Sequence, residues 1–97
     1  MAAYVIVDLQ QLVDGEKMAA YRPHGAAAVE KYGGRYIARG GKLDSLEGDW
    51  SSQRIAILEF ESLEQARAWY DSPEYVAARQ LRGGAAVMRM LAVEGVS

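Results

Sequence analysis

Four short runs of apolar and β-branched residues constrain the fold of this 97-residue chain more than any other feature. Their composition predicts strands at residues 4–9, 35–39, 54–60 and 87–94. Residues 18–32 and 62–82 instead carry apolar side chains at three- or four-residue spacing, which is typical of helices. This order predicts an α+β, ferredoxin-like βαββαβ fold, in which one antiparallel sheet carries the helices on a single face.

Local signals place the ends of the predicted helices. Pro23 lacks an amide hydrogen and obstructs the preceding turn, so we expect a kink or a restarted helix there. Gly33 suits the left-handed residue that ends the first helix. Ser62 and Gln65 predict a capping box at the start of the second helix, and Ser72, followed by a proline, predicts that this helix restarts.

Both faces of the predicted sheet are mostly apolar. In the first strand, Val5 and Val7 lie on one face, while Ile6 and Asp8 lie on the other. An antiparallel sheet with one wet face alternates apolar and polar residues more cleanly than this. Because the helices can cover only one face, we expect a second copy of the chain to cover the other. The result would be a symmetric homodimer in which two sheets meet face to face, and such dimers could assemble further into tetramers.

A few charges interrupt the second apolar face, at Asp8, Arg35, Arg39, Glu59 and Arg89. Buried charges persist when they are paired and hydrogen-bonded, so we expect some of these residues to pair in the interior. Arg39 and Arg89 are the expected partners of carboxylates, because a guanidinium can donate two parallel hydrogen bonds. The alternative is that these charges face solvent on the open sheet of a monomer.

Composition excludes several function classes. The chain has no cysteine, which rules out thiolate nucleophiles, iron–sulfur clusters and zinc–thiolate sites. Its formal net charge is −2 with both signs interspersed, so we expect no nucleic-acid partner. The apolar run near the N-terminus is short and lacks a basic flank, so we expect no membrane association and a cytoplasmic location. The length predicts a single domain over residues 1–97.

Several segments resemble a known family. They are KYGGRYIARGG at 31–41, LEGDW at 46–50, LEF at 58–60 and AWYDSPEY at 68–75, with Arg79, Arg82 and VEG at 93–95. Over nearly the whole chain the pattern is similar to domain of unknown function 1330, a family of small bacterial proteins in the dimeric α/β-barrel superfamily. The resemblance implies a ferredoxin-like protomer and a homodimeric barrel. It implies no activity, because the family is functionally uncharacterised.

The chain offers few groups for catalysis or metal binding. His24 is its only histidine and therefore the candidate acid or base, although such a histidine more often lies exposed on a helix or caps a carbonyl. One histidine and no cysteine predict no metal site. The carboxylates of Asp44, Glu47 and Asp49 are conceivable magnesium ligands, but their pattern is typical of a solvated loop. We expect no cofactor, since the glycine pairs lack nucleotide-binding spacing.

Aromatic residues suggest a pocket for a small apolar or aromatic ligand, lined by Tyr36, Trp50, Trp69, Tyr70 and Tyr75. Two function classes remain open. In the first, the protein binds or converts a small aromatic or carboxylate-bearing metabolite without a cofactor, using Tyr36, Arg39, Asp49 and Trp50. In the second, it is a non-catalytic homodimeric structural or regulatory module. Because the 40–53 loop carries Leu43, Leu46 and Trp50, we expect this loop to pack against the protein.

Overall fold

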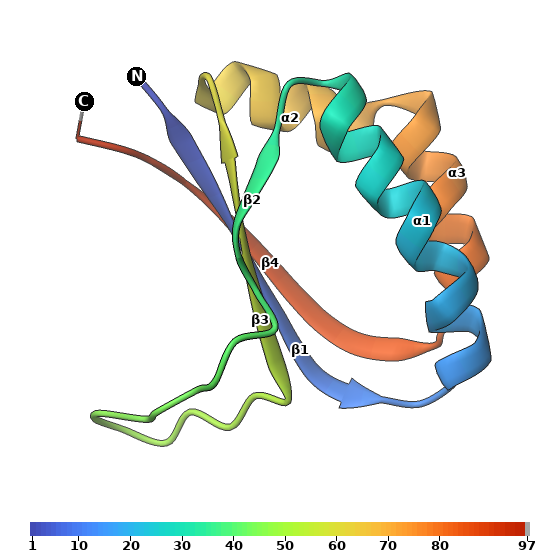
Figure 1. Cartoon of the computed structure of the whole chain (residues 1–97), viewed down its shortest axis with the longest axis vertical. Coiled ribbons are helices and arrows are strands. Elements are labelled where there is room, and N and C mark those ends of the chain that lie inside the picture. Colours follow the sequence, from blue (N-terminus) through green and yellow to red (C-terminus); the bar gives the residue numbers. More distant parts are fainter. Residues whose placement is uncertain (97) are drawn as a thin grey trace.

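The computed structural model describes residues 1–96 and shows strands and helices in the predicted alternation (Figure 1). The second predicted helix is divided into two, α2 and α3, by Ser72. In chain order the elements are β1 (Ala3–Leu12), α1 (Gly15–Lys31), β2 (Arg35–Arg39), β3 (Arg54–Phe60), α2 (Leu63–Asp71), α3 (Pro73–Arg82) and β4 (Ala86–Glu94).

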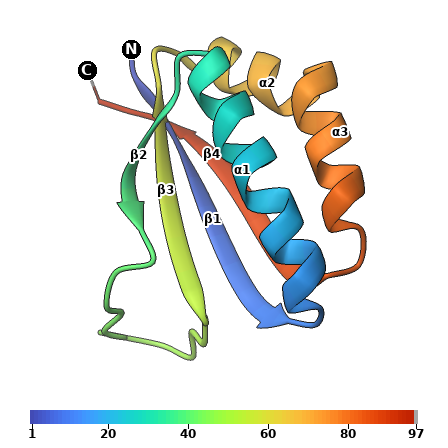
Figure 2. The same cartoon turned by 45° about the vertical axis from the view of Figure 1, so that its right-hand side comes forward.

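The strands form one antiparallel sheet in the order β2-β3-β1-β4. The three helices all lie on the same face of this sheet, as Figure 2 shows. We call the opposite face the outer face. The arrangement confirms the predicted ferredoxin-like α+β protomer.

The core lies between the sheet and the helices, around a cluster of aromatic rings. The ring centroid of Trp69 in α2 lies 4.3 Å from that of Tyr75 in α3 and 5.3 Å from that of Phe60 in β3. All three side chains are buried. Aromatic pairs of this kind contribute about 0.5–1.5 kcal/mol beyond the area they bury. Packing within this cluster therefore holds α2 and α3 against the sheet.

The predicted caps of α2 and α3 are confirmed. Ser62 Oγ accepts a hydrogen bond from the Gln65 amide at 3.0 Å, and Ser72 Oγ accepts one from the Tyr75 amide at 3.1 Å. The reciprocal half of the capping box is wrong. The Gln65 side chain instead donates to the Tyr32 carbonyl at 2.7 Å, which joins the start of α2 to the end of α1.

α1 runs through Pro23 without interruption, so the predicted restart is wrong. The proline is exposed and removes a single backbone hydrogen bond from a 17-residue helix, which the remaining turns tolerate. The helix ends as predicted at Gly33, whose φ of +77° lies in the left-handed region. The next residue, Gly34, lies directly against Phe60, and an added Cβ would be 2.5 Å from that ring.

Replacing Gly34 with alanine tests this close approach. The added methyl group would overlap the rings and methyl groups of Phe60 and Val29, so Gly34→Ala should lower the free energy of unfolding by about 1–3 kcal/mol. Gly84→Ala is the matched control, because nothing lies within 4 Å of an added Cβ there. Urea denaturation measures the difference. Equal stability of the two variants would contradict the prediction.

Candidate functional site

A β-bulge in β2 decides which face of the sheet each of its arginines occupies. Between Tyr36 and Ala38 the register against β3 slips by one residue, which leaves Ile37 as an extra residue in the strand. The alternation of side chains therefore reverses. Arg39 lies on the helix-covered face with Tyr36, and the expectation that it shares the outer face with Arg35 is wrong.

Arg39 is held by an aromatic ring rather than by a carboxylate. Its guanidinium carbon lies 4.2 Å from the centroid of the Tyr36 ring, a cation–π arrangement. Among residues 1–96, no carboxylate lies within ion-pair distance of Arg39. The expected pairing of Arg39 with a carboxylate of the protomer is therefore wrong, and its charge is free to meet a ligand.

A cavity lies between the sheet and helices α1, α2 and α3. Its volume is about 70 Å³, which is room for a few water molecules and about half of the roughly 150 Å³ that encloses a benzene ring. The apolar wall includes Val7, Leu9, Met18, Val29, Met88 and Met90. The polar wall consists of Tyr21, Arg22, Tyr36, Arg39, Arg54 and Tyr75.

The polar wall is positively charged. Arg22 comes from α1, Arg39 from the end of β2 and Arg54 from the start of β3, whereas no Asp or Glu of the described residues lines the cavity. The backbone of Gly40, which has a φ of +69°, passes close to the Arg54 guanidinium. An added Cβ at Gly40 would lie 3.0 Å from Arg54 Cζ. Apolar walls with a few convergent cations are typical of a site for a small organic anion.

Two tyrosines of the cavity, Tyr21 and Tyr36, have raised pKa values. Burial raises the pKa of Tyr36, although the nearby cations of Arg39 and Arg54 act in the opposite direction. Burial, with a smaller contribution from Tyr75, raises the pKa of Tyr21 far above its ordinary value. These phenols therefore keep their protons at neutral pH and cannot serve there as bases.

The structure places the predicted site residues in different parts of the molecule. Tyr36 and Arg39 line the cavity together. Trp50 lies on the outer face, where its indole nitrogen donates to Asp8. His24 is exposed on α1 and Asp49 is exposed in the 40–53 loop, and neither lines the cavity.

Sequence reasoning missed three polar residues of the cavity, Tyr21, Arg22 and Arg54. The helical spacing of Tyr21 and Met18 indicated a buried side of α1 but not a cavity. Arg54 alternates with Ala56, and so strand periodicity alone could have placed it on the helix-covered face. Arg22 carried no such signal.

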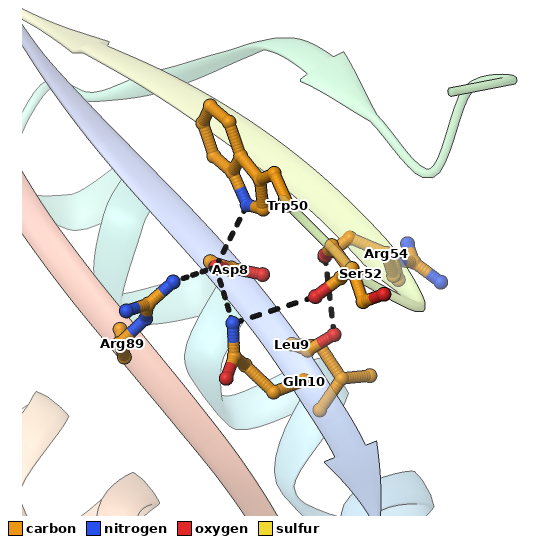
Figure 3. A network of polar contacts seen from close by, with 8 residues as sticks. Asp8, Leu9, Gln10, Trp50, Ser52, Arg54 and Arg89 are labelled. Atoms are coloured by element: carbon orange, nitrogen blue, oxygen red, sulfur yellow. Dashed lines mark hydrogen bonds and ion pairs between the residues drawn. The ribbon is translucent and has the colours of Figure 1, made fainter. Parts of the chain in front are cut away.

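A second polar cluster lies on the outer face around Asp8 (Figure 3). Its Oδ2 accepts hydrogen bonds from Arg89 Nη2 at 3.0 Å, Gln10 Nε2 at 3.0 Å and Trp50 Nε1 at 3.3 Å. The expected pairing of Arg89 with a carboxylate is confirmed, although through one nitrogen and not two. These contacts join β1, β4 and the end of the 40–53 loop.

Asp8 is 4% exposed, yet its neighbours favour the charged form. Burial by itself raises the pKa of Asp8, but the nearby Ser52 hydroxyl and the hydrogen bonds from Arg89, Gln10 and Trp50 outweigh it and hold the pKa below the ordinary value of 3.8. The other oxygen, Oδ1, is buried and has no hydrogen-bond partner among residues 1–96. A buried acceptor without a donor is costly, so the cluster has room for one more donor.

The remainder of the outer face is largely apolar and open within the described part of the chain. Leu91 is 68% exposed, and Ile37 and Val93 are about half exposed. At one end of this face, Arg35 pairs with Glu59 at 2.6 Å, with the arginine side chain exposed, so pairing in an interior stays a prediction for this pair. A sheet face of this composition is typical of a surface that contacts another protein.

The 40–53 loop extends away from the sheet over most of its length (Figure 1). Leu43, Leu46 and Trp50 are all exposed, Leu46 by 91%. The expectation that the loop packs against its own protomer is therefore wrong for the two leucines. Trp50 alone of the three reaches back, through its hydrogen bond to Asp8.

A family model described as domain of unknown function (DUF1330) matches residues 2–96. The chain belongs to the DUF1330 family. This match confirms the resemblance carried by the segments between residues 31 and 95. The family description assigns no activity to the DUF1330 chain.

Solved structures that share the DUF1330 fold are distant in sequence. A protein of unknown function from Rhodopseudomonas palustris is 18% identical with a TM-score of 0.75, over 99% of this chain and 83% of that one. A dimeric ferredoxin-like protein of unknown function from Jannaschia sp. is 13% identical with a TM-score of 0.64, over 98% and 100%. SnoaB, a cofactor-independent oxygenase from Streptomyces nogalater, is 7% identical with a TM-score of 0.59, over 99% and 93%. These likenesses show the fold.

No curated protein matches this DUF1330 chain significantly. Among residues 1–96, no helix combines the length and the apolar character needed to cross a bilayer. Over the same described range, no three His, Asp or Glu side chains gather in a way that could hold a metal ion. Asp44, Glu47 and Asp49 are all exposed along the loop.

Replacing Asp8 with asparagine tests the charge of the outer cluster. Because the pKa of Asp8 is lower in the folded protein than its ordinary 3.8, ionised Asp8 stabilises the fold above about pH 4, and this contribution is lost as the pH falls through the folded pKa. Asp8→Asn should therefore lower the free energy of unfolding at pH 7 by about 1–3 kcal/mol. It should also show a smaller further loss than the wild type between about pH 5 and pH 2.

Urea denaturation at a series of pH values measures both effects. Asp44→Asn, in the exposed loop, is the control that should keep the wild-type acid profile. If the free energies of unfolding of the wild type and Asp8→Asn fall in parallel with pH, Asp8 is not the group that causes the acid destabilisation.

Proposed function

We propose that this DUF1330 protein is a homodimer that binds a small aromatic carboxylate in the cavity of each protomer, without a cofactor. The observation that supports the proposal is the composition of the cavity wall, which combines three arginines and three tyrosines with apolar side chains. No acidic side chain of the described residues balances those arginines within the wall. An anionic ligand with an apolar body matches such a wall.

Arg39 is the residue we assign to the carboxylate. Its guanidinium borders the cavity and lies over the Tyr36 ring, which limits the orientations available to it. A guanidinium presents two parallel N–H groups that match the two oxygens of a carboxylate. Stacking on Tyr36 therefore prepares Arg39 for binding and reduces the entropy lost when the ligand arrives.

The apolar wall suits the ring of the ligand. Met88 and Met90 of β4 face the cavity beside Val7 and Leu9 of β1. Methionine side chains are flexible, and their sulfur atoms make favourable contacts with aromatic rings. The volume of about 70 Å³ is about half of what encloses a benzene ring, so the carboxylate end of a bound ring would extend toward the exposed Arg22 and Arg39.

The distant structural neighbours support this proposal only at the level of the fold. SnoaB is described as a cofactor-independent oxygenase, so a protein of this fold can act on a ligand without a cofactor. Because unrelated functions share folds, the reaction of SnoaB is not transferred to this chain. The ligand class proposed here rests on the residues of the cavity.

The homodimer is proposed from the outer face of the sheet. Leu91, Ile37 and Val93 are exposed there, and Asp8 Oδ1 is buried without a donor among residues 1–96. A second copy placed sheet to sheet would cover the apolar side chains and could supply a donor to each Asp8. Neighbours of the same fold are described as dimeric, which agrees with this arrangement. The cavity lies on the opposite side of the sheet and stays accessible in such a dimer.

Replacing Arg39 with methionine tests the ligand site. Loss of a charged hydrogen-bond donor should weaken benzoate binding by about 10- to 100-fold, because hydrogen bonds to charged groups contribute about 1.5–3 kcal/mol. Arg35→Met is the matched control on the same strand, since Arg35 lies on the outer face with Glu59. NMR titration with benzoate at pH 7 measures both affinities. No benzoate binding to the wild type would favour the non-catalytic homodimeric module instead.

Replacing Leu91 with glutamate tests the dimer. A charge at this exposed position of the outer face should convert the dimer to a monomer, because a buried unpaired carboxylate is strongly disfavoured in an interface. Val76→Glu is the control, because Val76 is an exposed apolar residue on α3. Size-exclusion chromatography with light scattering at micromolar concentration gives the masses. A monomeric wild type, or a dimeric Leu91→Glu variant, would refute the proposed interface.

A further inference from the structure

Two tyrosine hydroxyls from different helices meet at the wall of the cavity. The hydroxyl oxygens of Tyr21 in α1 and Tyr75 in α3 lie 2.6 Å apart, so one hydroxyl donates to the other. Arg82 Nη1 donates a longer hydrogen bond, of 3.4 Å, to the Tyr75 oxygen. Both tyrosines line the cavity, whereas Arg82 does not.

One of the two hydroxyl hydrogens in this pair has no acceptor within the described part of the chain. Two hydroxyls have two hydrogens, and their mutual bond uses one of them. If Tyr75 donates to Tyr21, the Tyr21 hydrogen is left without an acceptor. If Tyr21 donates to Tyr75, then Tyr75 accepts from both Tyr21 and Arg82, and its own hydrogen is left over. In either arrangement, one O–H group has no acceptor among residues 1–96.

The position of the pair is fixed by its surroundings. Tyr75 is fully buried in the aromatic core, 4.3 Å from Trp69 between ring centroids. Tyr21 packs against Gly25 one turn later in α1, where an added Cβ would lie 3.0 Å from the Tyr21 ring and 3.1 Å from its hydroxyl oxygen. Gly25 therefore makes room for the Tyr21 ring, and the hydroxyls are held in place on both sides.

The pair lies deeper in the protein than Arg22 and Arg39. Tyr75 is fully buried and Tyr21 is half-buried, whereas Arg22 and Arg39 are exposed. Both groups line the same cavity, so a ligand that bridges them would meet Arg39 with its carboxylate and the tyrosines with its other end. An oxygen at that end is the natural acceptor for the free hydroxyl hydrogen.

We infer that the Tyr21–Tyr75 pair donates a hydrogen bond to a second oxygen of the ligand, so that the ligand class is an aromatic carboxylate with a phenol or carbonyl oxygen at the opposite end. This inference rests on the proposed function and narrows it. The pair selects among aromatic carboxylates, because a ligand without the second oxygen leaves the buried donor unpaired. Such a penalty separates the affinities of two similar ligands more than a difference in apolar contacts does.

The test compares two ligands of nearly equal size, 4-hydroxybenzoate and 4-methylbenzoate. The measured quantity is the ratio of their dissociation constants, which cancels the contribution of the shared carboxylate and ring. Each single variant, Tyr21→Phe or Tyr75→Phe, leaves one hydroxyl that can still donate. The double variant Tyr21→Phe/Tyr75→Phe removes both, and replacing both partners of a hydrogen bond by apolar groups of the same shape is nearly neutral for stability.

In the double variant, the preference for 4-hydroxybenzoate over 4-methylbenzoate should fall by about three- to tenfold relative to the wild type. Benzoate affinity should change little, which also shows that the cavity remains folded. Tyr70→Phe is the control, because Tyr70 packs against Tyr75 but does not line this cavity. This control should keep the wild-type ratio.

The outcomes separate this inference from the proposed function. If benzoate binds in an Arg39-dependent way but the double variant keeps the wild-type ratio, the carboxylate site stands and the role of the tyrosine pair is refuted. If the wild type binds none of the three ligands, both are refuted. A single variant that loses the preference by itself identifies the hydroxyl that contacts the ligand.

Discussion

The alternation of side chains along each strand, and its interruption in β2, determines where the charges of this protein lie. In a regular strand, Arg35, Ile37 and Arg39 would share one face. The extra residue at Ile37 separates the two arginines, so that Arg35 pairs with Glu59 on the outer face while Arg39 reaches the cavity. A five-residue strand thereby contributes to two different electrostatic environments.

β1 connects these two environments. Consecutive residues of this strand face opposite sides of the sheet. Asp8 accepts the hydrogen bonds of the outer cluster, and Leu9 lines the cavity. The Leu9 carbonyl also accepts hydrogen bonds from the Gln53 amide at 2.8 Å and from Ser52 Oγ at 3.2 Å, which fix the end of the 40–53 loop. The loop, the outer cluster and the cavity wall thus share one short stretch of backbone.

The fold could be predicted from the sequence because its signals are local and consistent with one another. Strand composition, the Ser62 and Ser72 caps and the left-handed Gly33 each specify a boundary without reference to the rest of the chain. The apolar character of both sheet faces was also visible in the alternating residues. These features depend on nearest neighbours along the chain, which the sequence lists directly.

The cavity was less predictable because it depends on register. No residue type in RYIAR indicates that Ile37 is the extra residue, so regular strand alternation predicts the wrong face for Arg39. The sequence predicts four ligand-binding residues, of which Tyr36 and Arg39 line the cavity. The other two, Asp49 and Trp50, lie elsewhere. The Tyr21–Tyr75 contact joins residues 54 positions apart, a relation that only the packing of α1 against α3 creates.

The two tryptophans of the chain lie in contrasting environments on opposite sides of the sheet. Trp69 is 2% exposed in the aromatic core, while Trp50 is 58% exposed beside Asp8. Indole emission shifts to longer wavelength in water, so the blue and red portions of the intrinsic fluorescence spectrum originate from separate places. In a separate protomer, a dissolved quencher such as iodide reaches the second indole and spares the first. The protein therefore carries its own pair of optical reporters, one for the interior and one for the surface around the central strands.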